Sequence, residues 1–336
     1  MKNRLFFIFA TVTLLVVFLF SLAFGTHIVS CSQLYAALTQ PEPQNQQQAI
    51  VLYQRLPRAL IALYVGAMMA CSGLVFQARL SNPLASSSSL GINAGAVLFV
   101  IASHVFFAFD LLLQGIAALV GGLFGYLSSL AVARFTGAFN ALHGLLLILS
   151  GSLISMLYLG IANALLLAHP EVRAEYLSWL AGAINHAYIT RLHGFWWFGL
   201  LALAVLLLLA RPLTLILLGN EKALSIGINA ALVSRIALSA AIVAASSAVA
   251  ICGPIGFVGL VVPHIVRPLV GQHFLQALPA CALVGASVCL LANLGAQTLF
   301  QPYVVNTGIL MDLLGSLFFI WVIRNRYLSP ASVNTL

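Results

Sequence analysis

The chain has 336 residues, of which 62% are hydrophobic and only 6% are charged. A soluble globular domain carries roughly 25% charged residues because its surface faces water. So few charges exclude a soluble enzyme, a disordered chain and a nucleic-acid-binding protein, and they indicate a polytopic membrane protein surrounded by a lipid bilayer. The net charge of +8 fits the excess of Lys and Arg that cytoplasmic loops carry.

The first apolar segment has the length of a membrane span. Lys2 and Arg4 precede the apolar run 5–24, as they would in a signal peptide, and Ile28-Val29-Ser30-Cys31 resembles a lipoprotein cleavage site. The run of about 20 residues is longer than the roughly 7–15 residues of a signal-peptide core. We therefore expect an uncleaved transmembrane helix.

Ten apolar segments along the chain predict an all-α membrane protein with a single transmembrane domain over 1–336. The predicted spans are 5–24, 59–78, 91–109, 114–133, 143–167, 194–211, 235–252, 255–271, 277–299 and 304–323. Ten crossings put ten Lys and Arg residues in the cytoplasm and four outside, whereas nine crossings give seven on each side. The positive-inside rule therefore predicts that all ten segments cross and that both termini are cytoplasmic.

Three connections are long enough to hold structure. Residues 27–55, on the outer side, include a polar linker, and residues 169–193, also outside, place Trp179 and Tyr188 where aromatic residues meet the membrane surface. On the inner side, residues 212–234 can form a short helix. Asn220 would cap this helix, Glu221 would lie in its first turn and Gly227 would end it.

Residues with chemical potential are few. The chain has only two lysines, and neither belongs to a phosphate-binding loop, so it cannot hydrolyse ATP by that chemistry. No zinc motif is present, the eight histidines show no ligand spacing, and we expect no metal or cofactor on this chain. Asp312 is the one acid inside a predicted span, which makes it a candidate intramembrane polar site for ion coupling.

Small and helix-breaking residues indicate how the spans pack. Gly66, Ala70 and Gly73 form one stripe that permits close helix approach. The segments 91–95 and 253–259 are rich in glycine, and non-helical backbone at membrane depth is tolerated only against protein or a water-filled cavity. We therefore place near a translocation pathway Asn93, Gly95, Gly253, Pro254, Gly256, Phe257, Gly259, Pro263 and His264.

Several segments together resemble a known family. They are Arg55-Leu56-Pro57-Arg58, Asn82-Pro83-Leu84-Ala85, Leu90-Gly91-Ile92-Asn93-Ala94-Gly95-Ala96, Trp179-Leu180-Ala181-Gly182, Leu218-Gly219 with Ala223 and Ser225-Ile226-Gly227-Ile228-Asn229, and, most specifically, the run from Gly253 to Arg267. In this order they resemble the FecCD/BtuC-type permease subunits of ABC importers for ferric siderophores, haem and vitamin B12. Within that family, the motifs Leu-Gly-Ile-Asn and Trp-Leu-Ala-Gly are most similar to those of the ferric-dicitrate permeases.

The resemblance implies a type II ABC importer permease in the bacterial inner membrane, with a ferric siderophore as cargo and vitamin B12 or haem as the alternative. Two separate ATPase subunits would hold ATP and Mg, and a periplasmic binding protein would deliver the chelate. We expect that protein to dock on Arg55 and Arg58. The ATPase would bind the 212–234 coupling loop through Gly219, Glu221, Ala223, Leu224, Ser225 and Gly227. An ion-coupled transporter that uses Asp312 is the alternative of another class.

The sequence departs from the family pattern near its end. Val304-Val305-Asn306 replaces a common Glu-Leu-Pro, Gln297 replaces an arginine, Asn293 replaces an aspartate and Leu317 replaces a proline. A twofold homodimer would have to supply all docking residues from one chain. Because the set is incomplete here, we favour a heterodimer with a related permease over a homodimer.

Overall fold

The computed structural model describes residues 2–25, 28–40, 43–135, 143–301, 303 and 305–326, and all regular structure within these ranges is helical. The elements, including the π-helical η1 and the 3-10 turn η2, are α1 (Lys2–Ala23), α2 (Cys31–Thr39), α3 (Gln46–Ile50), η1 (Val51–Arg55), α4 (Leu56–Arg79), α5 (Ile92–Phe107), α6 (Leu111–Phe135), α7 (His143–Ala168), α8 (Pro170–Leu180), η2 (His186–Tyr188), α9 (Ile189–Leu208), α10 (Ala210–Leu217), α11 (Asn220–Ser225), α12 (Ala230–Cys252), α13 (Val258–Val270), α14 (Phe274–Thr298) and α15 (Thr307–Arg326).

The prediction of about ten spans is confirmed. Within the described ranges, 7 helices are long and apolar enough to cross a membrane, and the shorter apolar helices α5, α13 and α15 occupy the other three predicted spans. The boundaries differ where the backbone stays helical beyond the membrane. The second span is one continuous helical stretch over Gln46–Arg79, well before its predicted start at 59.

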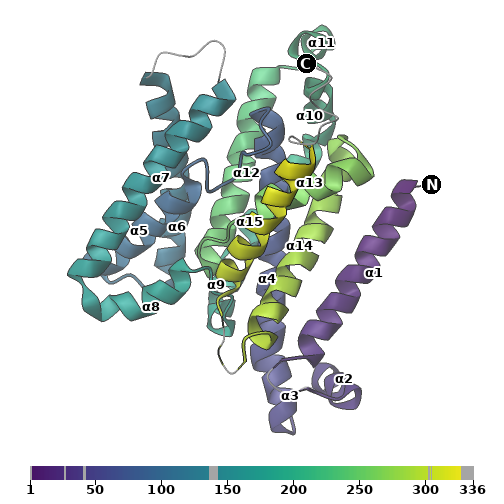
Figure 1. Cartoon of the computed structure of the whole chain (residues 1–336), viewed down its shortest axis with the longest axis vertical. Coiled ribbons are helices and arrows are strands. Elements are labelled where there is room, and N and C mark those ends of the chain that lie inside the picture. The colour runs from purple at the N-terminus through teal and green to yellow at the C-terminus, as the bar shows by residue number, and fades with distance from the viewer. Residues whose placement is uncertain are drawn as a thin grey trace.

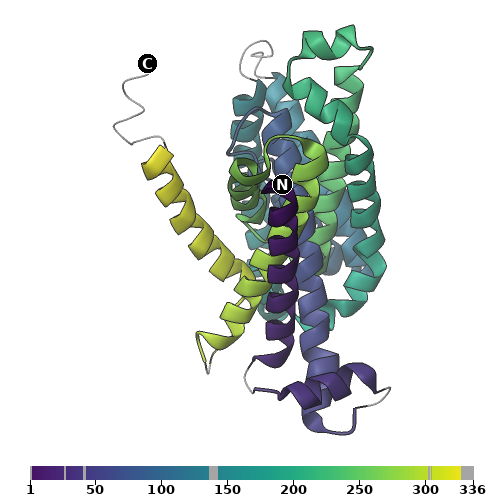
Figure 2. The ribbon, with the colours of Figure 1, turned by 90° about the vertical axis from the view of Figure 1, so that its right-hand side faces the viewer.

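Burial separates central helices from lipid-facing ones. The most apolar window of α4 is 78% buried and that of α12 is 72% buried, against 22% for α1 and 28% for α6 and α7. Figure 1 shows α4, α12 and α14 in the middle, with α1 on one side and α5, α6 and α7 on the other. In Figure 2, α15 leans away from the bundle. The outer helices expose leucine and phenylalanine because lipid tails solvate these side chains.

Glycine contacts bring the central helices together. A Cβ on Gly66 of α4 would overlap the backbone carbonyl of Gly285 in α14, and a Cβ on Gly73 would overlap that of Gly259 in α13. Such contacts let two helix backbones approach closely, which yields packing energy where no hydrophobic force acts between helices. The predicted small-residue stripe is therefore confirmed.

The long connections lie at opposite ends of the bundle, as predicted. The helices α2, α3 and α8 lie at one end of the bundle, and α11 lies at the opposite end (Figure 1). One expectation in this region is wrong. Trp179 is only 2% exposed, and its indole ring lies 5.7 Å from the guanidinium carbon of Arg191. This tryptophan is a core residue that holds α8 on the bundle, and it is not an anchor at the membrane surface.

Candidate functional site

The break between α12 and α13 lies at membrane depth. With 13 residues, α13 is about 20 Å long, which is shorter than the roughly 30 Å of a bilayer core. The link 253–257 therefore enters the bundle before α13 begins. Gly253 has φ +81°, and a Cβ there would overlap the carbonyl oxygen of Trp179, so only glycine fits. Phe257 has φ +60°, an uncommon conformation for a bulky residue.

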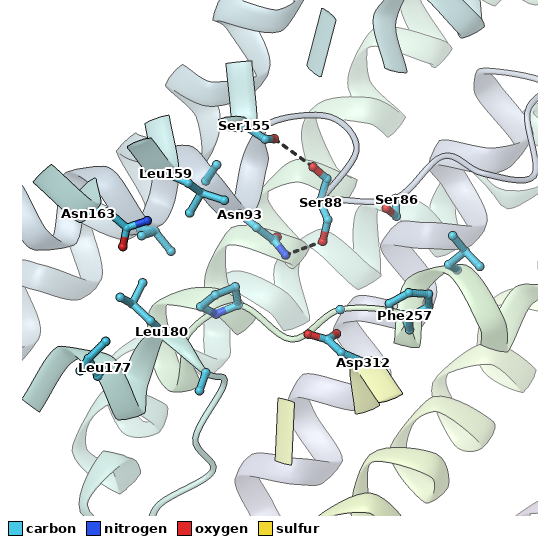
Figure 3. Close-up of a pocket in the computed structure, with 16 residues that line it drawn as sticks. Ser86, Ser88, Asn93, Ser155, Leu159, Asn163, Leu177, Leu180, Phe257 and Asp312 are labelled. Carbon is cyan, nitrogen blue, oxygen red and sulfur yellow. Dashed lines mark hydrogen bonds between the residues drawn. The ribbon is translucent and has the colours of Figure 1, made fainter. Parts of the chain in front are cut away.

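This link forms one wall of the membrane-depth cavity, a hollow of about 720 Å³. The other walls come from α5, α7, α8, α13, α15 and the segment before α5. Figure 3 shows the side chains that line the cavity. Its lining residues are Ser86, Ser88, Asn93, Ala94, Val97, Ser155, Leu159, Asn163, Leu177, Leu180, Ala181, Pro254, Gly256, Phe257, Leu260 and Asp312. The size is that of a small-molecule site, and the lining combines apolar walls with a few polar groups.

Hydrogen bonds fix part of the polar lining. The Asn93 side-chain amide donates from Nδ2 to Ser88 Oγ at 2.9 Å, and Ser155 Oγ donates to the Ser88 carbonyl at 3.1 Å (Figure 3). These bonds tie α5 and α7 to the segment that precedes α5. Asp312 projects from α15 against Gly256, where a Cβ would overlap Oδ1.

Four of the nine predicted pathway residues line this cavity, namely Asn93, Pro254, Gly256 and Phe257, and so does Asp312, the separate candidate for an intramembrane polar site. Three others serve packing instead: Gly95 contacts Gly121, Gly253 contacts Trp179, and Gly259 contacts Met69. The remaining two belong to α13, which continues through Pro263 without a break, while His264 lines a separate hollow of about 310 Å³ with Arg267, Pro268 and Gln272.

The sequence interpretation missed the contribution of α7. Ser155, Leu159 and Asn163 are spaced by four residues and therefore share one helix face. Two polar residues on one face of an otherwise apolar span are a usable signal for a hydrated cavity. The run Ser86 to Ser89, directly before the predicted third span, is a second such signal.

The two arginines at the outer end have different surroundings. Arg55 is only 6% exposed, and its Nη1 donates to the carbonyls of Leu22 at 2.9 Å and Ala23 at 2.8 Å. This burial argues against the expectation that Arg55 is presented to a docking protein. Arg58 is half-buried and lines a small outer hollow of about 60 Å³ with Asn185, Gln297 and Asn306.

The inner connection contains the predicted short helix, α11. Gly219, and not Asn220, is its cap residue, with φ +124°. At the other end, Ile228 N–H bonds to the Ala223 carbonyl at 3.0 Å and Gly227 N–H to the Leu224 carbonyl at 2.9 Å. This is a Schellman motif, and Gly227 supplies its positive φ of +80°.

Most of the predicted coupling residues are at the surface. Gly219, Glu221, Leu224, Ser225 and Gly227 are exposed, whereas Ala223 is fully buried and anchors the helix to the bundle. Leu224 is 62% exposed and Ile226 is 65% exposed. Large apolar side chains that are exposed on a short helix at one end of the bundle are typical of an interface with another protein.

Ten apolar helices within the described residues, a broken helix and a cavity with a polar lining indicate a membrane transport protein. The model of the FecCD transport family matches residues 13–325, and the chain belongs to this family. It is therefore a transport permease subunit and not an enzyme. The resemblance that its motifs indicated is confirmed.

Relatives match over most of their length. The chain is 32% identical to the Fe(3+) dicitrate transport system permease protein FecC of Escherichia coli, over 93% of this chain and 95% of the relative. It is 34% identical to the Fe(3+)-citrate import system permease protein YfmD of Bacillus subtilis, over 83% of each chain. Among solved structures, an inward-facing metal-chelate type ABC transporter matches with a TM-score of 0.77 and 30% identity, over 96% of this chain and 99% of the other.

Proposed function

We propose that this chain is the membrane-spanning permease subunit of an ATP-driven ABC importer that moves a ferric siderophore or a related iron chelate across the inner membrane. The observation that carries the proposal is the membrane-depth cavity. It opens between α5, α7, α8 and α15, and its walls mix apolar and polar groups as a passing chelate requires. The names of two relatives, FecC and YfmD, which are permeases of iron citrate systems, support this class of cargo.

The energy would come from two separate ATPase subunits docked on α11. A rigid helix is needed to transmit their motion, and α11 is held by glycines of positive φ at both ends. Leu224 and Ile226 offer the apolar contact. The N-terminus and the C-terminus would lie on this cytoplasmic side, in agreement with the distribution of Lys and Arg.

A periplasmic binding protein would deliver the chelate at the opposite end. Arg58 lies there among the side-chain amides of Asn185, Gln297 and Asn306, and its guanidinium suits a carboxylate of the partner. Arg55 would support this surface from below by holding α1. A second, related permease would complete the dimer.

The test is uptake of a ⁵⁵Fe-labelled chelate by proteoliposomes that contain the permeases, the ATPase and the binding protein. We expect uptake that needs ATP and persists without any ion gradient, and no ATP hydrolysis by this chain alone. Uptake driven by a proton or sodium gradient without ATP would overturn the proposal in favour of a secondary transporter. ATP-dependent uptake restricted to vitamin B12 or haem would overturn the choice of cargo.

A further inference from the structure

We propose that the membrane-depth cavity selects cargo that presents a positive charge or N–H donors, and that Asp312 is the residue that makes this selection. The inference rests on the proposed function, because it names the charge class of the chelate that passes. It goes beyond that function, since the names of the relatives do not give the charge of the cargo, and two of them, FecC and YfmD, are permeases of systems for iron citrate, which is an anionic chelator.

The first observation is the charge of the lining. Asp312 is the only acidic or basic residue among the described residues that line this cavity. The remaining polar lining consists of neutral hydroxyl and amide groups, from Ser86, Ser88, Asn93, Ser155 and Asn163. Three arginines line hollows elsewhere and are not part of this lining, namely Arg58, Arg211 and Arg267. One carboxylate without an offsetting cation sets a negative potential, which low-dielectric walls make stronger.

The second observation is that hydrogen-bond acceptors in the cavity lining remain without a donor. The Asn93 side-chain amide donates a hydrogen bond from Nδ2 to Ser88 Oγ. Its Oδ1 is buried without a hydrogen-bond partner among the described residues. The Ser155 hydroxyl donates its proton to the Ser88 carbonyl. These internal bonds use the donors of Asn93 and Ser155, so the Asn93 carbonyl oxygen and the Asp312 carboxylate remain as acceptors, beside the Asn163 side-chain amide, which offers both donors and an acceptor. A buried acceptor without a donor costs free energy, which a cargo with N–H groups would recover.

The third observation is the seating of the carboxylate. The missing side chain of Gly256 makes room for Asp312, whose Oδ1 occupies the space that a Cβ at position 256 would need. Asp312 nevertheless remains exposed, and Figure 3 shows it across the cavity from Asn163. A cargo between these two walls would contact both. Charged residues inside membrane spans mark substrate pathways because they are costly to keep there.

The cavity potential can be measured without knowing the cargo. Asn163→Cys places a thiol on the cavity wall opposite Asp312, in a Cys31→Ser background, because Cys31 is the exposed native cysteine and the other four are buried. The reaction rates with a trimethylammonium methanethiosulfonate and a sulfonate methanethiosulfonate give a ratio that reports local charge. We expect Asp312→Asn to lower the cationic-to-anionic ratio about tenfold, because the two reagents respond in opposite directions to the lost charge.

The matched control is the native chain, in which Cys31 reports the potential at the outer end. Asp312→Asn should leave the ratio at Cys31 unchanged. The inference would be overturned if the ratio of the two reaction rates at Asn163→Cys were the same with and without the Asp312→Asn substitution, whatever the transport data show. An equal change at both thiols would also overturn it, since it would indicate a general rearrangement.

A second arm uses the cargo itself. Three hydroxamate anions neutralise Fe(III), so a ferric trihydroxamate with a pendant amine carries a positive charge, its acetylated form is neutral and its succinylated form is negative. Uptake by Asp312→Asn is divided by wild-type uptake for each chelate, which cancels the preference of the binding protein. We expect this quotient to be several-fold lower for the ammonium form than for the succinylated form. Equal quotients would overturn the selective role. If no iron chelate is taken up with ATP, the proposed function fails, and the thiol labelling still decides the charge of the cavity.

Discussion

Arg55 Nη1 donates a hydrogen bond to the carbonyl oxygen of Leu22 at 2.9 Å, and so joins the turn before α4 to the last turn of α1. The same nitrogen also donates to the Ala23 carbonyl at 2.8 Å. The last carbonyls of a helix have no partner within the helix, and a cation near them also interacts favourably with the helix dipole. The outer end of α1, which is otherwise mostly lipid-exposed, is therefore held in place by a side chain 33 residues further along the chain.

We predict that Arg55→Ala lowers the thermal stability of the complex and leaves its affinity for the binding protein almost unchanged. Each hydrogen bond to a charged donor contributes about 1.5–3 kcal/mol, so the loss should lower the melting temperature of the detergent-solubilised complex by several degrees. Thermal unfolding followed by tryptophan fluorescence measures this change. The affinity of the folded variant for the loaded binding protein should stay within about twofold.

Arg58→Ala is the matched control, since it removes the neighbouring arginine of the same helical stretch. Arg58 lines the outer hollow, and its replacement should weaken docking and its dependence on salt while the melting temperature changes little. The assignment of the two roles is wrong if the two variants show the reverse pattern.

The second prediction concerns the crossing of α4 and α14. In Gly66→Ala the new methyl group would overlap the backbone carbonyl of Gly285, which cannot move as a flexible side chain would. Overpacking of this kind costs about 1–3 kcal/mol. Gly160→Ala is the control, because a Cβ there has nothing within 4 Å. We expect Gly66→Ala to reduce the folded yield and melting temperature and Gly160→Ala to leave both unchanged; equal effects would contradict the close crossing.

The number and order of the spans could be predicted from the sequence because lipid imposes a simple rule. A span needs about 20 apolar residues, and this pattern is local. The stripe of Gly66, Ala70 and Gly73 could be found for the same reason, since it follows from helix periodicity. The opposite sides of α2 and α11 followed from the count of Lys and Arg.

The parts that could not be predicted depend on contacts between distant segments. Arg55 and Arg58 look equivalent in the sequence, and only the end of α1 distinguishes the buried one from the one in the outer hollow. Trp179 is a residue type that often lies at the membrane surface. It is buried here because the position of α8 packs it against Arg191 and Gly253. The cavity gathers residues from α5, α7 and α15, a combination that no local pattern encodes.

The third prediction concerns the end of α11. Gly227 has φ +80°, and no atom lies within 4 Å of the position that a Cβ would take, so a substitution there acts through backbone conformation and not through a clash. Gly227→Val should weaken ATPase binding or uncouple ATP hydrolysis from transport, since a β-branched residue is strained in this conformation. Gly227→Asn is the control, because asparagine tolerates positive φ. Coupled transport at the wild-type rate by Gly227→Val would remove the claim that α11 must be rigid.

The last prediction is that this chain works with a different permease and not with a second copy of itself. A twofold homodimer presents each docking residue twice, so one chain must supply the complete set. Here the outer hollow contains Arg58 together with uncharged Gln297, Asn293 and Asn306, while Val304 lies outside the described residues. A related partner with charged residues at these positions could bind the other lobe of the binding protein. The measurement is ⁵⁵Fe uptake and subunit stoichiometry when this chain is expressed with its ATPase and binding protein but without a second permease. We expect docking and uptake at a small fraction of the rate of the four-component system, and full uptake by a complex with two copies of this chain would show that the homodimer suffices.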